Sequence, residues 1–233
     1  MSASSDCSKK KSVKAPQAGF TLVEIAIVLV IIGLLLGGIL KGQEMITQAK
    51  IKNIINDFNG VTVAVTSYQD RYRAIPGDDP NATTRWTVQA PASGNSDGIM
   101  AGKYNAVVAS GAPTSAQESN LFWQHLRIAG FVAGLTTGTG SGSAPPSASG
   151  GIIGVEAAVV GTSGLGFTSL IVCSSNLPDK VAIAVDTQAD DANSATGQIR
   201  AQLQTAANPD TVAAAASAYV ETAVNQYLVC KTL

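Results

Sequence analysis

An apolar run from Phe20 to Leu40, interrupted by one acid at Glu24, constrains this chain more than any other feature. As a helix rising about 1.5 Å per residue, the run could cross a hydrocarbon core of ~30 Å. A carboxylate inside such a segment costs free energy unless it has a partner. We therefore expect Glu24 to meet a positive charge at the same depth. A cut after Gly19 would create one, the free amine of Phe20.

The residues ahead of the run form a basic leader with one acid, Asp6, and four lysines: Lys9, Lys10, Lys11 and Lys14. Positive flanks stay cytoplasmic, so the rest of the chain is expected across the membrane. An ordinary secretory signal has its small-residue cleavage site after the apolar core, whereas here the small residues precede it. Cleavage would remove the leader and leave the apolar helix on the mature protein. An uncleaved signal anchor is the alternative, but it leaves the acid unexplained.

The string Gly-Phe-Thr-Leu-Val-Glu at 19–24, followed by the apolar run, resembles the class III signal of type IV pilins and type II secretion pseudopilins. The resemblance implies that a prepilin peptidase cuts after Gly19 and that Phe20 is then N-methylated. It also implies that Glu24 faces the amine of a neighbouring subunit and sets the assembly register, so that the buried charge is paired. Many major pilins have a proline near the position of Lys41, and this chain has none.

The resemblance implies a structural subunit of a type IV pilus-like filament, and not an enzyme. The alternatives are a pseudopilin of a type II secretion system and a minor pilin with a role in adhesion or DNA uptake. The implied partners are further copies of the chain in a helical filament, prepilin peptidase, a pilus assembly platform and the membrane. The implied location is the inner membrane with a periplasmic carboxy-terminal domain, and an extracellular filament after assembly.

Composition indicates a weakly charged, exported domain. Charged residues make up 13% of the chain, and its formal net charge is −1. Removing the leader takes away four lysines and one acid, so the remainder is more acidic than the whole. A general nucleic-acid binder would show clustered basic residues, so no specific nucleic-acid partner is expected.

Two of the three cysteines, Cys173 and Cys230, lie beyond the leader, and Cys7 lies within it. An even pair in an oxidising compartment predicts a disulfide. In the chain-entropy model, closing a loop of this size stabilises the fold by ~4 kcal/mol. Many pilins tie down their carboxy-terminal region in this way, so the resemblance implies the same bond. Two unpaired thiols in a core are the alternative.

Apolar residues at helical spacing predict that the first helix continues to Ile75, where Pro76 and Gly77 end it. The expected domains are a cleaved leader, a long helix whose first part spans the membrane, and a globular domain: 1–19, 20–75 with 20–40, and 76–233. Taken together, the sequence predicts an α+β fold in which the long helix packs on a small antiparallel sheet.

Within the globular domain, the pattern predicts a helix at 115–135 and a charge-poor loop at 136–151. A second helix is predicted at 209–228, with an extended tail as the alternative. Short β-like runs predict an antiparallel meander of four strands: 152–160, 167–173, 181–186 and 198–203. Three strings also resemble a subset of bacterial prepilin-like proteins: YQDRYRAIPGDDP at 68–80, NSDGI at 95–99 and LFWQHLRIAG at 121–130.

Catalytic chemistry is hard to find in the sequence. The single histidine, His125, lies among aromatic residues, which is typical of a packed or surface residue rather than a catalyst. The glycine-rich string at 138–142 lacks the Gly-Lys-Ser/Thr ending of a phosphate-binding loop, so it is predicted to be linker. No serine or cysteine has a base partner at a recognised spacing.

Calcium is the one small ligand that the sequence suggests. Two segments supply hard oxygen ligands of the kind that calcium takes: Asn95 and Asp97, and Asp190 and Asp191. Some pseudopilins are stabilised by calcium, so the resemblance points the same way. Neither segment matches an EF-hand, and Asp and Asn are also ordinary turn formers. No other cofactor is expected.

Overall fold

The computed structural model describes residues 19–159, 161–214 and 218–233. The chain divides into two compact units, Met1–Met45 and Ile46–Leu233. Residues 1–18, which make up nearly all of the predicted leader, lie outside the described residues.

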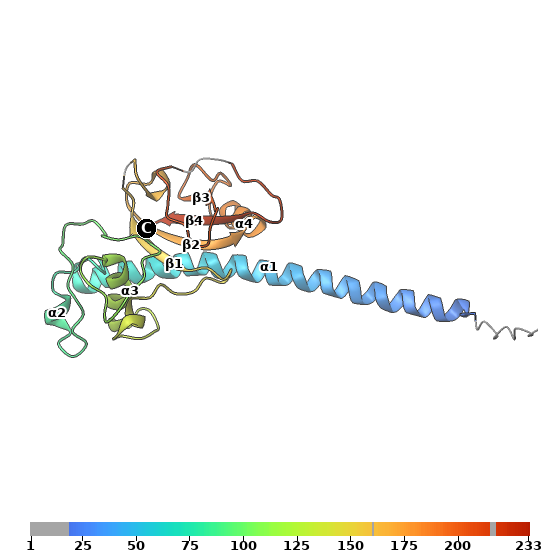
Figure 1. Cartoon of the computed structure of the whole chain (residues 1–233), viewed down its shortest axis with the longest axis horizontal. Coiled ribbons are helices and arrows are strands. Elements are labelled where there is room, and N and C mark those ends of the chain that lie inside the picture. Colours follow the sequence, from blue (N-terminus) through green and yellow to red (C-terminus); the bar gives the residue numbers. More distant parts are fainter. Residues whose placement is uncertain (1–18, 160, 215–217) are drawn as a thin grey trace, which may run out of the picture. The chain divides into compact units, whose positions relative to one another are not determined.

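The longest element is helix α1, which runs from Leu22 to Tyr72 and contributes residues to both units (Figure 1). It is the one helix in the described part of the chain that is long and apolar enough to cross a membrane, with a mean hydropathy of 2.8 over an 18-residue window. The predicted end at Ile75 is three residues too late. Arg73 adopts a φ of 57°, which stops the helix before Pro76.

In the second unit, one face of α1 is buried at the predicted three- and four-residue spacing. The buried residues are Ile51, Ile54, Phe58, Val61, Ala64, Val65 and Tyr68. They belong to one hydrophobic core together with residues of the sheet. The prediction of a long helix packed on a small antiparallel sheet is therefore confirmed, and the fold class is α+β.

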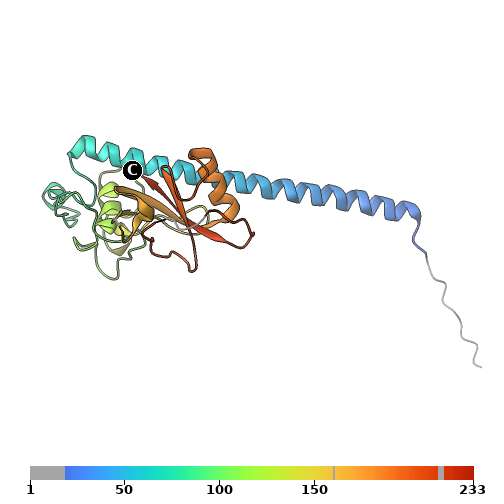
Figure 2. The same cartoon turned by 90° about the horizontal axis from the view of Figure 1, so that it is seen from above.

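The sheet has four antiparallel strands in the order β1-β2-β4-β3 (Figures 1 and 2). Their bounds are Ile153–Ala157 for β1, Leu170–Pro178 for β2, Ile199–Leu203 for β3 and Gln226–Thr232 for β4. The predicted simple meander is wrong, because the last strand of the chain lies between β2 and β3. Strands β2 and β3 therefore both hydrogen-bond to β4.

The predicted strand at 181–186 is wrong, because helix α4 occupies Asp179–Ala189. Its apolar residues Val181, Ala182 and Val185 belong to the same core as α1. Their spacing of one, three and four residues fits one helix face. A run this short does not distinguish strand from helix by pattern alone.

The predicted helix at 209–228 is also wrong. Its described residues form an irregular connection and then β4, as in the extended alternative. Tyr227 and Val229 pack in the core that contains α1, whereas Leu228 and Cys230 pack in a second core on the other side of the sheet. A strand with both faces buried explains why this segment is apolar without a helical period.

The predicted cysteine pair forms a disulfide in the second core. Cys173 in β2 and Cys230 in β4 are direct partners across the two central strands, with an S–S distance of 2.07 Å. Both residues are fully buried. The bond therefore links the last strand to the middle of the sheet.

Two further helices and two 3₁₀ turns lie in the loops. They are α2 (Ala82–Arg85), α3 (Glu118–Ile128), η1 (Thr139–Gly142) and η2 (Gly164–Gly166). Helix α3 is shorter than the predicted 115–135, because Gly130 adopts a φ of 80° just after its end.

The charge-poor segment at 136–151 is fixed by Arg127, which is buried at the end of α3. The Arg127 guanidinium donates to the carbonyl oxygens of Ser141 at 2.6 Å and Ser143 at 2.7 Å. Ser141 and Gly142 are buried as a result. The composition correctly predicted a loop, but it gave no sign that an arginine of the preceding helix would hold it.

Candidate functional site

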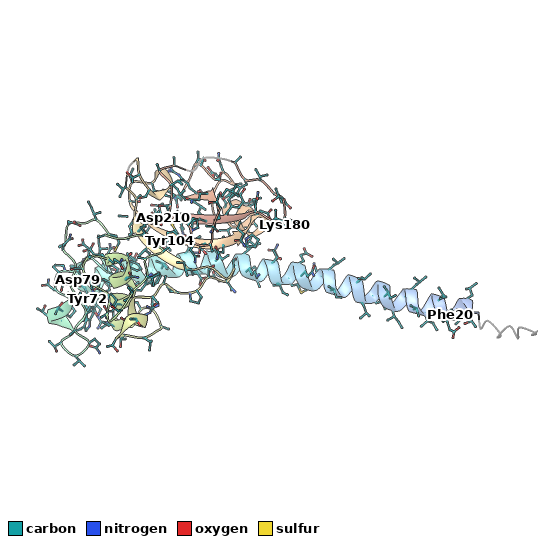
Figure 3. The ribbon with its side chains drawn as sticks, in the orientation of Figure 1. Phe20, Tyr72, Asp79, Tyr104, Lys180 and Asp210 are labelled. Atoms are coloured by element: carbon teal, nitrogen blue, oxygen red, sulfur yellow. A yellow bond between two sulfur atoms is a disulfide. The ribbon has the colours of Figure 1, made fainter. Side chains whose placement is uncertain are left out.

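The apolar side chains between Phe20 and Leu40 are exposed, and no other described part of the chain covers them. Phe20 is 83% exposed and Leu22 is 87% exposed (Figure 3). Leu34, Leu35 and Leu36 are 73%, 61% and 56% exposed. A contiguous apolar surface of this length is typical of a membrane or protein contact. The segment is therefore the first candidate functional site.

The predicted cleavage position lies where a peptidase could reach it. Gly19 and Phe20 precede the helix and are exposed. Their peptide bond is not part of the α1 hydrogen-bond ladder, which begins at Leu22. The structure thus places the two residues in irregular backbone at the start of the apolar segment.

Glu24 is held by Thr21 in a reciprocal arrangement at the first turn of α1. The Thr21 N–H and hydroxyl donate to Glu24 Oε2 at 2.8 and 2.7 Å. The Glu24 N–H donates back to Thr21 Oγ1 at 3.2 Å. This is a capping box, and it places the carboxylate at the positive end of the helix dipole. The sequence analysis missed the role of Thr21, although the Thr-x-x-Glu spacing was a signal for it.

The three strings that resemble prepilin-like proteins meet around the carboxy-terminal end of α1. Buried Asp79 is the centre of this distal cluster, which also contains Tyr68, Arg85, Trp86 and His125. The Tyr68 hydroxyl donates to Asp79 Oδ2 at 2.7 Å, and the Arg85 guanidinium donates to the same oxygen.

Burial alone would raise the pKa of Asp79. The hydrogen bonds from Arg85, Tyr68 and the Asn81 N–H favour the charged form and lower the pKa below its ordinary value. Arg85 also lies over the rings of Tyr72 and Trp86, at 4.4 and 5.1 Å from their centroids. The charged pair is therefore enclosed by aromatic side chains, which makes it part of the packing.

His125 is fully buried beside this pair and uses both ring nitrogens. Nδ1 accepts a hydrogen bond from the Gly77 N–H, and Nε2 donates to the Ala92 carbonyl oxygen, both at 3.0 Å. Burial lowers the pKa of the imidazole. These contacts give His125 the packed role that the sequence indicated.

The structure groups the predicted calcium ligand Asp97 with two buried acids, Asp78 and Glu118, whose carboxylates all lie within 4.8 Å of one another. Asn95 lies beside them and donates from its side chain to Asp97 at 2.8 Å. Burial raises the pKa of Glu118, and the nearby charges of Asp78 and Asp97 add to that effect. The sequence analysis did not select Asp78 or Glu118, which are distant in sequence from the NSDG turn.

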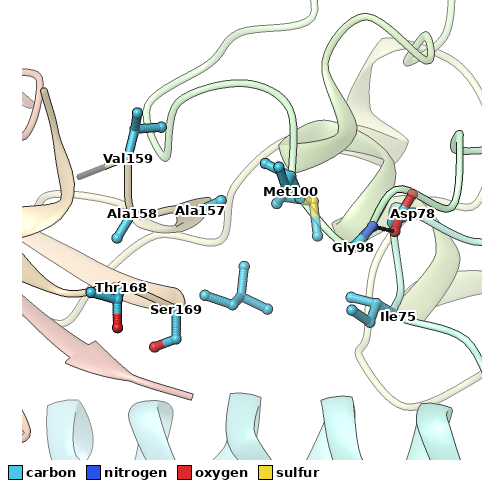
Figure 4. A pocket seen from close by; sticks show the side chains of 11 residues that line it. Ile75, Asp78, Gly98, Met100, Ala157, Ala158, Val159, Thr168 and Ser169 are labelled. Carbon is cyan, nitrogen blue, oxygen red and sulfur yellow. Dashed lines mark hydrogen bonds between the residues drawn. The ribbon is translucent and has the colours of Figure 1, made fainter.

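Backbone N–H groups of the 95–101 loop donate hydrogen bonds to the carboxylates of Asp78 and Glu118. Glu118 accepts from the N–H groups of Asn95 at 3.1 Å and Ala101 at 2.9 Å. Asp78 accepts from Ser96 and, at 2.9 Å, from Gly98 (Figure 4). The two acids therefore fix the 95–101 loop. This loop lines one wall of a mostly apolar cavity of about 320 Å³.

The other predicted pair, Asp190 and Asp191, lies with a third acid, buried Asp186, near the end of α4. Burial raises the pKa of Asp186. The Tyr219 hydroxyl and the Ala192 N–H donate to its two oxygens at 2.7 and 3.1 Å. Asp190 accepts from the Ile199 N–H at 2.7 Å, so this group also joins segments of the fold.

Comparison with known proteins identifies the amino-terminal segment. Residues 14–40 match the prokaryotic N-terminal methylation motif, and this stretch contains Gly19, Phe20 and Glu24. The match supports the resemblance to type IV pilins and pseudopilins, whose motif family is structural rather than catalytic. It implies, in general terms, processing by prepilin peptidase and assembly into a filament. Together with the apolar helix, it is consistent with anchoring in the inner membrane.

The second unit has no such match. Comparisons of the chain with curated proteins and with solved structures found no match. The motif covers the apolar segment, and the cores, the distal cluster and the acidic groups all lie beyond it.

Proposed function

We propose that this chain is a structural subunit of a type IV pilus-like filament. The observation that carries the proposal is the exposed apolar segment with Glu24 near its start, in a stretch that matches the methylation motif. Cleavage after Gly19 and methylation of Phe20 would precede assembly. The globular domain would lie in the periplasm before assembly and on the outside of the filament afterwards.

The apolar segment explains how one chain can lie first in the bilayer and later in a filament. Burying a Leu, Ile or Val side chain is worth about 1.5–3 kcal/mol, so exposing the whole run to water would cost on the order of tens of kcal/mol. A single chain would therefore stay in the bilayer. Leaving it becomes favourable only when the same surface passes directly onto other copies, whose helices then form an apolar filament core.

Glu24 gives that core a register. In the single chain its carboxylate accepts hydrogen bonds from Thr21 but has no opposite charge within the described residues. The amine of Phe20 on an adjacent copy would supply that charge. A shifted copy would leave a buried charge alone, which costs several kcal/mol. Correct stacking is then favoured over shifted stacking.

The partners that follow are further copies of the chain, prepilin peptidase, an assembly platform and the membrane. A pseudopilin of a type II secretion system, or a minor pilin, uses the same processing and assembly chemistry. Imaging of surface filaments with an antibody to the globular domain separates these roles. If the chain is a pilus subunit, the antibody should label long filaments along their length. If the chain is a pseudopilin, the antibody should label no such filaments.

The test of the filament role compares two acids on the same helix. Glu24→Ala should leave membrane insertion intact and reduce filament yield by at least tenfold, because the register charge is lost. Glu44→Ala is the matched control, because Glu44 lies past the apolar run in an exposed 2.8 Å pair with Lys41. Its filament yield should stay within about twofold of wild type.

Sequencing the mature protein from its first residue provides an independent check. We expect N-methylated phenylalanine from position 20. Wild-type filament yield from Glu24→Ala, or a mature chain that retains the lysine-rich leader, contradicts the proposal.

Calcium binding stays a prediction. Of the two acidic groups, the one that contains Asp97 has two buried carboxylates. If calcium binds there, millimolar calcium should raise the midpoint of thermal unfolding relative to EDTA, and Asp97→Asn should remove the effect. An equal midpoint in calcium and EDTA contradicts the prediction. The filament role needs no other cofactor.

A further inference from the structure

We propose that His125 is an acid-sensitive clasp that holds the segment 77–92 against α3 and releases it in mildly acidic surroundings. This inference concerns the second unit alone and does not depend on the filament role. It rests on the two hydrogen bonds of the imidazole and on the groups that surround the ring.

The imidazole binds both ends of one segment. The Gly77 N–H donates to Nδ1 and Nε2 donates to the Ala92 carbonyl oxygen, each at 3.0 Å. Helix α2 lies between these two residues. A single side chain on α3 therefore closes a loop of the chain, and the ring must be neutral with its proton on Nε2 to make both bonds.

Protonation removes the acceptor that one of these bonds requires. A charged imidazole has an N–H at both positions, so Nδ1 would point a donor at the Gly77 N–H. The ring is fully buried, so water cannot replace the lost bond while the clasp is closed. The closed arrangement is therefore incompatible with the charged ring.

The surrounding groups do not compensate for the added charge. Tyr68 of α1 stacks on the ring, with centroids 6.3 Å apart, and Trp86 lies at 6.0 Å. Asp79 favours a charged imidazole and Arg85 disfavours it, and the two are paired with each other. Burial dominates these opposed effects and lowers the pKa of His125.

The sign of the pH effect follows directly. In the open state the imidazole is solvated, with an ordinary pKa of ~6.5. The clasp therefore stabilises the closed state fully above that value and weakens as the pH falls below it. If only the open state takes the proton, the open-to-closed ratio rises about 30-fold between roughly pH 7.5 and pH 5.0.

Opening would change the surface that the domain presents. Trp86 and Tyr72 are partly buried against the core, and Trp86 follows α2 directly. Release of 77–92 would free both aromatic rings to contact solvent or another surface. The strands of the sheet hydrogen-bond to one another, so we expect the opening of 77–92 to leave the sheet unchanged.

Hydrogen exchange on the full-length chain in detergent micelles tests the clasp. After correction for the intrinsic pH dependence of exchange, protection of amides in 77–92 should fall about 30-fold from roughly pH 7.5 to pH 5.0. Protection in β2 and β4 should stay constant. Equal protection of 77–92 at both pH values overturns the proposal.

The matched variant is His125→Asn, which keeps a polar side chain but does not titrate. It should have weaker protection of 77–92 at pH 7.5 and a pH response below about threefold. A full pH response in this variant would assign the effect to the nearby carboxylates Asp78 and Glu118 and overturn the proposal.

A second measurement covers the case in which His125→Asn fails to fold. Because His125 is the only histidine in the sequence, its ring proton gives one assignable NMR signal. We expect the closed-state signal to keep its position down to pH 5 while a second, protonated signal grows. A single signal that titrates smoothly near pH 6.5 with 77–92 protection unchanged overturns the clasp.

Discussion

Helix α1 passes through two regions that differ in the burial of its apolar side chains, which are exposed in the first unit and buried along one face in the second. In the first unit, Leu35 is 61% exposed, and in the second, Phe58 is 1% exposed. Both lie in the same unbroken helix, so local structure does not account for the difference. The second unit contains its own sheet and helices to cover the apolar face, whereas the described residues of the first unit leave its apolar side chains exposed. An apolar helix can therefore serve folding in one half and assembly in the other.

The largest expected effect is the loss of a buried apolar side chain in the second unit, compared with the loss of an exposed one in the first. Phe58→Ala should lower the free energy of unfolding of the second unit by about 3–5 kcal/mol, because a buried ring is lost and a cavity remains. Leu35→Ala should change it by less than about 0.5 kcal/mol. Denaturant unfolding in micelles, followed by tryptophan fluorescence, measures both. A similar loss from both variants would show that the two regions share one core.

Loss of the disulfide should act on the second unit alone. Replacing Cys173 and Cys230 with Ala should destabilise this unit by about 2–4 kcal/mol, because the unfolded chain gains freedom. Membrane insertion of the first unit should be unaffected. Chemical denaturation of the double variant tests the first statement, and membrane fractionation tests the second. Unchanged stability would mean that strand pairing alone holds β4 in place.

Asp79→Asn tests the buried acid of the second unit, which contrasts with the exposed Glu24 of the first. We expect a loss of about 2–3 kcal/mol at neutral pH, because Arg85 loses its ionic partner inside the aromatic cluster. The lowered pKa of Asp79 means that its contribution is present above the unfolded pKa and disappears as the pH falls through the folded one. The variant and wild type should therefore converge in stability in acid. A constant gap down to about pH 2 would rule out the charge as the cause.

The smallest expected effect concerns the capping box of the first unit. Thr21→Val should weaken the first turn of α1 by ~1 kcal/mol, because the two hydrogen bonds that the Thr21 hydroxyl makes with Glu24 are lost. Thr21→Ser should retain the effect of the hydroxyl. Amide exchange near the start of α1 measures the change. Equal exchange in wild type and Thr21→Val would show that the hydroxyl does not contribute.

The sequence predicted the parts of the fold that depend on local pattern. The spacing of Ile51, Ile54 and Phe58 was enough to predict the long helix and its buried face. Cys173 and Cys230 were the natural disulfide pair once the leader was set aside. The amino-terminal segment was readable because its signal lies within a few consecutive residues.

The errors came from pairing over long distances. The position of β4 between β2 and β3 depends on contacts with Ser174 and Ala201, and nothing near Val229 specifies them. The short run around Val185 fits a strand or a helix until its neighbours are known. Sheet position and the α4 assignment were therefore beyond local reasoning.

The distal cluster shows the same limit for the site. The sequence indicated a packed or surface residue at His125, and the structure buries it, but its partners at Gly77 and Ala92 come from a loop whose course the sequence does not give. Glu118 lies more than 20 residues after Asp97 in the sequence, and only the fold places it beside Asp78 and Asp97. The sequence shows which residue types are present, but it does not show which residues become their neighbours in the fold.

The place of β4 has a consequence for how the protein is made. Strand β4 follows the other three strands in the chain, so the ribosome synthesises it after β2 and β3, and these two strands are joined only once β4 has been made. A premature stop before Gln226, or a tag that strains the chain after Thr232, would affect the centre of the sheet rather than its rim. A copy that lacks β4 therefore cannot complete the sheet, because β2 and β3 then have no strand between them.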